Sequence, residues 1–299
     1  MLTPFEQVER SYGAAVERIL AGQPGAGALL RRVSAADPGF ALAHAGLALL
    51  HHRAGRPEAA GRRLERAAGA AGGASRRVRS HVEVLAGLIE GPPGPAPRAR
   101  RLTRLRAHLA LFPRDPLLVQ EGAELLTWEA GADPRPARLA FLRALAPHFV
   151  GDWWFPGEYA FDLAERGQPQ RAAALARLAL GRNPRHAGAA HALAHALFEA
   201  GDAGTGAAFL RAWLPGYCPR GAEHSHLSWH LALFELAGGR EAPAEAVYRT
   251  ALDPAALPAR RLQDSASFLW RRSLKRPGRP LPWGPVRATA ARAAARPGS

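Results

Sequence analysis

The chain has 299 residues, of which 47% are hydrophobic and 22% are charged, a balance that excludes a disordered polypeptide. Forty basic residues against 25 acidic ones give a net charge of +15, but nearly all the basic residues are arginine, as GC-rich coding favours, so the charge is weak evidence for nucleic-acid binding. The single cysteine, Cys218, excludes an internal disulfide and a cysteine-based metal site.

The first predicted element is a helix that begins after Thr3, a good N-cap, with Pro4 in its first position. Apolar residues follow at helical spacing from Phe5 to Leu20. Glu6 lies where a secretory signal needs positive charge, and no stretch approaches the roughly 18 consecutive apolar residues of a membrane span. We therefore expect a cytoplasmic protein that does not associate with membranes.

Similar helical segments, of about 12 to 17 residues, fill the chain as far as residue 274, and the alternation typical of strands is absent. Both observations predict an all-α protein. Glycines that separate these segments recur at intervals of 34 to 40 residues, at Gly55, Gly91, Gly131, Gly167, Gly201 and Gly239. A period near 36 residues is typical of tetratricopeptide helix-turn-helix repeats.

Small and large residues keep a fixed register with these glycines. Small side chains let the two helices of a pair approach, and large ones fill the space beside the next pair. The positions are Leu47, Ala48, Ala60, Leu64 and Ala67; Tyr159, Ala160, Ala172, Ala176 and Ala179; Leu193, Ala194, Gly206 and Leu210; and Leu231, Ala232, Ala244 and Tyr248. Because one pair cannot bury its apolar face alone, we expect a single α-solenoid over residues 1–274, with about six helix pairs and a terminal helix.

The pattern stops near residue 274. Residues 271–299 hold eight basic residues and no acidic one, and prolines are frequent among them. We therefore expect residues 275–299 to be a disordered basic tail whose contact with nucleic acid is at most non-specific.

Two pairs of histidines have helical i, i+4 spacing: His191 with His195, and His226 with His230. Glu199 continues the first stripe by one turn. Each pair lies on the first helix of a repeat, and the first helices of adjacent repeats stand about 10 Å apart on the concave surface, so the two pairs can converge.

Three interpretations of these histidines are open. The imidazoles can form a structural cluster held by hydrogen bonds across helices, which is the interpretation we favour; they can line a groove for a peptide or a small anionic ligand; or they can bind zinc or iron. Because no glutamate lies between the histidines of a pair, as it does in H-E-x-x-H, zincin chemistry is not expected.

Tryptophans occur close to these helices in the sequence, at Trp153, Trp154 and Trp229. They either fill the core or provide aromatic anchors on the wall of a binding groove. The sequence has no G-x-S-x-G elbow, no phosphate-binding P-loop and no strand to carry a dinucleotide fingerprint. We expect no catalytic residue and no cofactor.

The segment with the two histidine pairs resembles a known family. It contains His191-Ala-Leu-Ala-His195, Gly201, Phe209-Leu210, Trp213-Leu214, the run from His226 to Leu236, and Ala246-Val247-Tyr248. This stretch is similar to the signature of the tetratricopeptide repeat protein 38 family in its bacterial form, and residues 35–44 and 76–91 resemble the family's early repeats. The resemblance covers about residues 1–274 and implies an α-solenoid with no established catalytic activity.

The functional expectation is a non-catalytic scaffold, monomeric or weakly dimeric, that binds a partner protein or peptide in its concave groove. His191, His195, Glu199, His226, Trp229, His230, Trp153 and Trp154 are the candidate groove residues. The alternative is a ligand-sensing protein or a metal-dependent enzyme that uses the four histidines.

Overall fold

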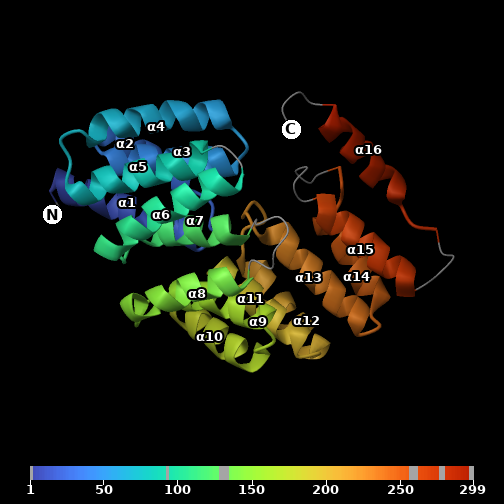
Figure 1. The fold of residues 1–299 in the computed structure, drawn as a ribbon. Coiled ribbons are helices and arrows are strands. Elements are labelled where there is room, and N and C mark those ends of the chain that lie inside the picture. Colours follow the sequence, from blue (N-terminus) through green and yellow to red (C-terminus); the bar gives the residue numbers. More distant parts are fainter. Residues whose placement is uncertain (1–2, 92–93, 128–134, 256–261, 276–279, 296–299) are drawn as a thin grey trace. The chain divides into compact units, whose positions relative to one another are not determined.

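The structure is a computed structural model that describes residues 3–91, 94–127, 135–255, 262–275 and 280–295 (Figure 1). These residues form helices and connecting turns, with no strand among them. The all-α prediction is therefore confirmed. The chain divides into two compact units, residues 1–155 and residues 156–299, and each is described by itself.

In the first unit, consecutive helices pack against one another, most extensively α3 with α4. The helices are α1 (Pro4–Leu20), α2 (Ala26–Ala36), α3 (Ala41–Arg53), α4 (Pro57–Ala71), α5 (Arg76–Glu90), α6 (Pro95–Leu111), α7 (Pro116–Thr127), α8 (Arg135–Leu145) and the 3-10 turn η1 (Ala146–Phe149). Helix α1 starts as predicted, because Thr3 and Glu6 form a reciprocal capping box around Pro4.

The second unit is also built from packed helices, with extensive packing of α10 on α11 and of α13 on α14 (Figure 1). Its helices are α9 (Phe155–Glu165), α10 (Pro169–Arg182), α11 (Ala187–Glu199), α12 (Ala203–Trp213), the 3-10 turn η2 (Leu214–Gly216), α13 (His224–Ala237), α14 (Glu241–Ala251), α15 (Leu262–Lys275) and α16 (Trp283–Ala294). No helix in the described part of the chain is both long and apolar enough to cross a lipid bilayer.

The turn glycines confirm the repeat register. Four of the six have the positive φ that favours glycine, with values of 67°, 69°, 71° and 74° at Gly55, Gly167, Gly201 and Gly239. Gly91 differs, because its φ of −63° and ψ of 134° end α5 in an extended conformation. Gly131 lies outside the described residues.

The small positions of the repeat are buried, as close packing of the paired helices requires. Ala48, Ala160, Ala194 and Ala232 occupy equivalent places in four repeats, and each has 0% of its surface exposed. The helices can therefore approach closely along these positions.

The prediction of a disordered tail was wrong for residues 283–294, which form α16. Val286 is 7% exposed and belongs to the core built by α13, α14 and α15, with Leu281 and Trp283 packed beside it. Pro282 precedes the helix and Pro285 lies in its first turn, where the lack of an N–H breaks no hydrogen bond within the helix. Residues 276–279 and 296–299 of the predicted tail lie outside the described residues.

Candidate functional site

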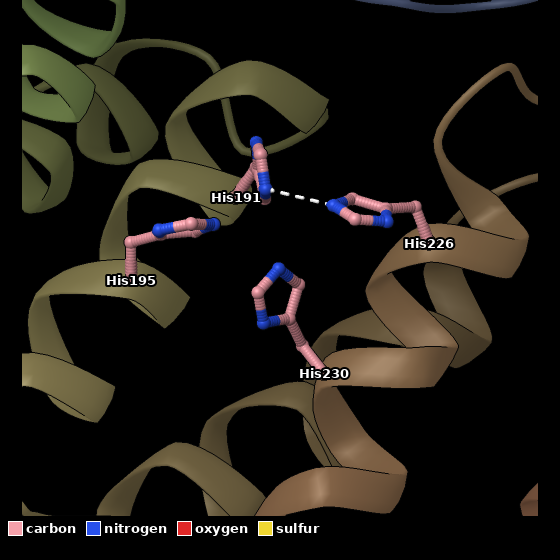
Figure 2. A group of neighbouring side chains, drawn as sticks. All are labelled: His191, His195, His226 and His230. Carbon is pink, nitrogen blue, oxygen red and sulfur yellow. Dashed lines mark hydrogen bonds between the residues drawn. The ribbon is translucent and has the colours of Figure 1, made fainter. Parts of the chain in front are cut away.

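Helices α11 and α13 bring the two predicted histidine pairs together. His191, His195, His226 and His230 each offer one ring nitrogen, and these four nitrogens lie within 4.8 Å of one another. The rings point toward a common space between the two helices (Figure 2). We call this group the four-histidine cluster.

Hydrogen bonds orient three of the four rings. His226 Nε2 lies 3.1 Å from His191 Nε2, so one of these nitrogens donates to the other. On its other side, His226 Nδ1 is 3.1 Å from the Oδ1 atom of Asp264 in α15, and His195 Nδ1 is 2.7 Å from the Oε1 atom of Glu165 in α9. A neutral imidazole that donates its Nδ1–H to a carboxylate keeps the lone pair on Nε2. In His195 and His226, the Nε2 lone pair therefore lies on the side of the ring opposite the carboxylate.

His230 is the deepest member of the four-histidine cluster. The residue is 4% exposed, and its Nε2 atom is buried without a hydrogen-bond partner among the described residues. Burial, reinforced by the electrostatic influence of neighbouring His195, His226 and Arg271, holds the pKa of His230 well below its ordinary value. The ring is therefore neutral near pH 7 and offers a lone pair or an N–H that no described group satisfies.

Aromatic side chains surround the cluster. Phe161 of α9 stacks on His191 with ring centroids 5.2 Å apart, and Trp229 stacks on His226 at the same distance. The guanidinium of Arg271 lies over the Trp229 ring, 5.5 Å from its centroid. Trp229, one of the predicted groove residues, is thus part of the apolar wall beside the imidazoles.

The other predicted groove residues lie elsewhere. Glu199 is exposed at the end of α11 and is not a member of the cluster. Trp154 belongs to the first unit and is 1% exposed, packed against Phe149 and Phe155, so the structure contradicts its prediction as a groove anchor. Trp153 is half-buried beside it.

Sequence reasoning missed the two carboxylates that bond the histidines. Glu165 precedes His195 by 30 residues, and Asp264 follows His226 by 38. The separation of 38 residues lies within the 34 to 40 residue spacing of the turn glycines, and the separation of 30 lies below it. The repeat period therefore indicates which helices are neighbours, but not which carboxylate on them faces a histidine.

The first unit holds a second candidate site, a hollow of about 770 Å³ lined from α2, α3 and α4. Its charged members are Arg31, Arg63 and Arg66, and they adjoin the buried imidazole of His44; we call these four residues the arginine pocket. No acidic side chain of the described residues lines it. Sequence reasoning missed this site as well, and the i, i+3 spacing of Arg63 and Arg66 on one helix face was its only local signal.

Two hydrogen bonds fix the tautomer of His44 beside the arginines. His44 Nε2 is 3.1 Å from the carbonyl oxygen of Pro38, to which it donates, so its Nδ1 accepts from Arg63 Nη1 at 3.3 Å. Burial, together with the charges of Arg63 and Arg66, lowers the pKa of His44. Burial and the neighbouring positive charges of Arg66 and Arg31 also lower the pKa of Arg63.

Comparisons with known proteins give little direct guidance. No protein-family model matches the sequence, and neither does any curated protein. Among solved structures, the chain is similar to the TPR domain of P58(IPK), with 14% identity, a TM-score of 0.25, and coverage of 96% of this chain and 97% of that chain. A TM-score this low does not support a structural relationship. The helical-repeat architecture therefore rests on the packing and burial described above.

Proposed function

We propose that the chain is a non-catalytic helical-repeat protein, of the bacterial tetratricopeptide repeat protein 38 type, that binds an acidic segment of a partner protein. The arginine pocket carries this proposal. It gathers three guanidinium groups from two helices around a hollow that no carboxylate of the described residues lines. Stacked helix pairs are a framework that presents such groups from several helices to one extended ligand.

A carboxylate is the ligand chemistry that best fits the pocket. The planar guanidinium group matches a carboxylate with two parallel hydrogen bonds. His44 accepts from Arg63 and so holds its side chain in place before a ligand arrives. Burial lowers the pKa of Arg63, and repulsion from Arg66 and Arg31 lowers it further, so a bound negative charge would relieve part of that repulsion.

The remaining lining favours a peptide over a bulky ligand. It consists of small or compact residues, namely Ser34, Ala35, Pro38, Gly39, Gly69 and Ala70. These leave room for an extended main chain. We place the peptide site here rather than at the four-histidine cluster, because the rings of that cluster face one another.

The test measures binding of a fluorescein-labelled heptapeptide rich in Asp and Glu, by fluorescence polarisation at physiological salt. A peptide with Asn and Gln in place of the acids is the reference ligand. The double substitution Arg63→Gln with Arg66→Gln is expected to weaken binding of the acidic peptide about tenfold or more, since charge-assisted hydrogen bonds contribute about 1.5 to 3 kcal/mol each.

A matched control uses Arg32→Gln with Arg62→Gln. Arg32 and Arg62 lie on α2 and α4, the two helices that carry the arginines of the pocket, but neither residue lines it. Their substitution removes the same amount of charge as the test variant does. The control variant should bind as the wild-type chain does. An equal loss in both double variants would show that only the overall charge attracts the peptide, and would refute the pocket as the site.

A further inference from the structure

We propose that the four-histidine cluster is a metal site, in which His191, His195, His226 and His230 bind one divalent transition-metal ion, with zinc as the best match. The site lies in the second unit and is independent of peptide binding in the first. Its function is to link adjacent repeats.

The spacing of the imidazoles is close to that of a tetrahedral site. Zn–N bonds of about 2.0 to 2.1 Å put the ligand nitrogens about 3.3 Å apart. The Nε2 atoms of His191 and His226 are already 3.1 Å apart, and all four ligand atoms lie within 4.8 Å. The other rings therefore need to close by about 1.5 Å at most, which small side-chain rotations achieve.

The outer hydrogen bonds prepare the rings for a metal. His195 bonds Glu165 through Nδ1, and His226 bonds Asp264 through Nδ1. A ligating histidine in a metal site commonly donates its other N–H to a carboxylate, which fixes the tautomer and makes the inner nitrogen a better ligand. His195 and His226 both have that partner.

Burial without hydrogen-bond partners is the second, independent observation. His230 presents an unpartnered Nε2 from a side chain that is 4% exposed. Asp264 is 3% exposed, and its Oδ2 atom is buried with no hydrogen-bond partner in the described part of the chain. A buried carboxylate needs a nearby cation. A divalent ion bound by four neutral imidazoles would supply that cation, and its charge would balance Glu165 and Asp264 together.

The ligand set indicates both the metal class and its role. Nitrogen-only ligands exclude magnesium and calcium, which require oxygen, and suit zinc, copper, nickel or iron. Four protein ligands complete a tetrahedral shell and leave no position for water or substrate, as in structural zinc sites. Because His191 and His195 come from α11 and the other two from α13, the ion would cross-link two neighbouring repeats.

The experiment uses the full chain after treatment with a chelator and dialysis. Titration with zinc chloride is expected to show one ion per chain, and a hundredfold excess over Kd should raise Tm by about 5 °C or more. Cobalt chloride serves as a spectroscopic probe, because tetrahedral cobalt absorbs visible light far more strongly than the octahedral aqueous ion does. Copper and nickel salts, titrated in parallel, test whether zinc is preferred.

Variants separate this site from adventitious binding. His195→Gln, whose side chain is 23% exposed, should fold without metal, lose zinc affinity at least a hundredfold, and lose the cobalt spectrum. Glu165→Gln should weaken zinc binding about tenfold to a hundredfold. His224→Gln is the matched control, since His224 lies on α13 but outside the cluster, and it should bind as the wild-type chain does.

Three results would overturn the proposal: no stoichiometric binding of zinc, cobalt, copper or nickel by the wild-type chain; binding that survives His195→Gln; or an equal loss in the His224→Gln control. None of them affects the peptide measurement with the arginine pocket, so the two proposals fail separately.

Discussion

Asp115 shows what a single buried residue does in the first unit. Its Oδ2 atom accepts hydrogen bonds from His81 Nδ1 at 2.7 Å and from His108 Nε2 at 3.2 Å, while Ser80 donates to the other nitrogen of His108. Its Oδ1 atom accepts from the backbone N–H of Leu118 in α7. One carboxylate thus connects α5, α6 and the start of α7.

The substitution Asp115→Asn is expected to destabilise the chain by about 2 to 3 kcal/mol at pH 7, because two buried imidazoles lose a charged acceptor. Burial alone raises the pKa of Asp115, but His81 and His108 outweigh it and hold the pKa well below its ordinary value. The folded chain therefore releases this proton more readily than the unfolded chain does. The stabilisation is present above the unfolded pKa, about 4, and is lost as pH falls below it.

Urea unfolding from pH 7 to pH 3 measures this effect. The difference in free energy of unfolding between wild-type and Asp115→Asn chains should narrow as the pH falls. A constant difference over the whole range would mean that the charge of Asp115 makes no contribution.

At the residue scale, spacing along the chain determined what the sequence could predict. The i, i+4 pairs and the repeat period placed His191 and His195 opposite His226 and His230, and the structure brings all four together. Asp264 could not be assigned, since its role depends on which turn of α15 faces α13. Trp154 was ambiguous for a similar reason: an aromatic residue next to a helix start fits a core or a surface equally well.

At the element scale, the close approach of α12 and α13 depends on a glycine. A Cβ atom added at Gly206 would overlap the ring of Phe234, which is 1% exposed. The repeat register had already marked position 206 as one for a small residue. The backbone of Gly206 is helical, a conformation that other residues adopt as well. Glycine is therefore needed at this position because a side chain would not fit, and not because of its backbone conformation.

Gly206→Ala is expected to lower the stability of the second unit by about 1 to 3 kcal/mol, because the added methyl group displaces a packed ring. Gly204→Ala on the same helix is the control, since its Cβ atom would meet only Asp202 Oδ1, at 3.9 Å. Thermal unfolding followed by circular dichroism should show a lower Tm for the first variant and an unchanged or slightly higher one for the second. Equal Tm values would show that the ring moves aside at no cost.

Local signals predicted the elements well where they act within one helix. The capping box at Thr3 and the positive φ at Gly167, Gly201 and Gly239 follow directly from residue type. Helix α16 was missed because its stability comes from burial of an apolar face against another helix. Charge and proline content, which suggested disorder, do not report on such packing.

At the scale of the whole molecule, each unit has its own core, and the second unit extends to α16. Its last part joins α13, α14 and α15 around Phe268 and Leu269, both 0% exposed, and Val286 of α16 covers them. The C-terminal segment therefore belongs to the folded second unit despite its basic composition.

Truncation after Lys275 is expected to remove this cover and to destabilise the second unit by about 2 to 4 kcal/mol, since it exposes the apolar surface that Leu281, Trp283 and Val286 bury. Truncation after Ala295 keeps α16 and is the control. Hydrogen exchange followed by mass spectrometry should show faster exchange in α13, α14 and α15 of the shorter chain, and unchanged exchange in α1 to α4, which belong to the other unit. Unchanged exchange in both units would mean that α16 contributes no stability, and that residues 283–294 behave as the disordered segment predicted from their composition.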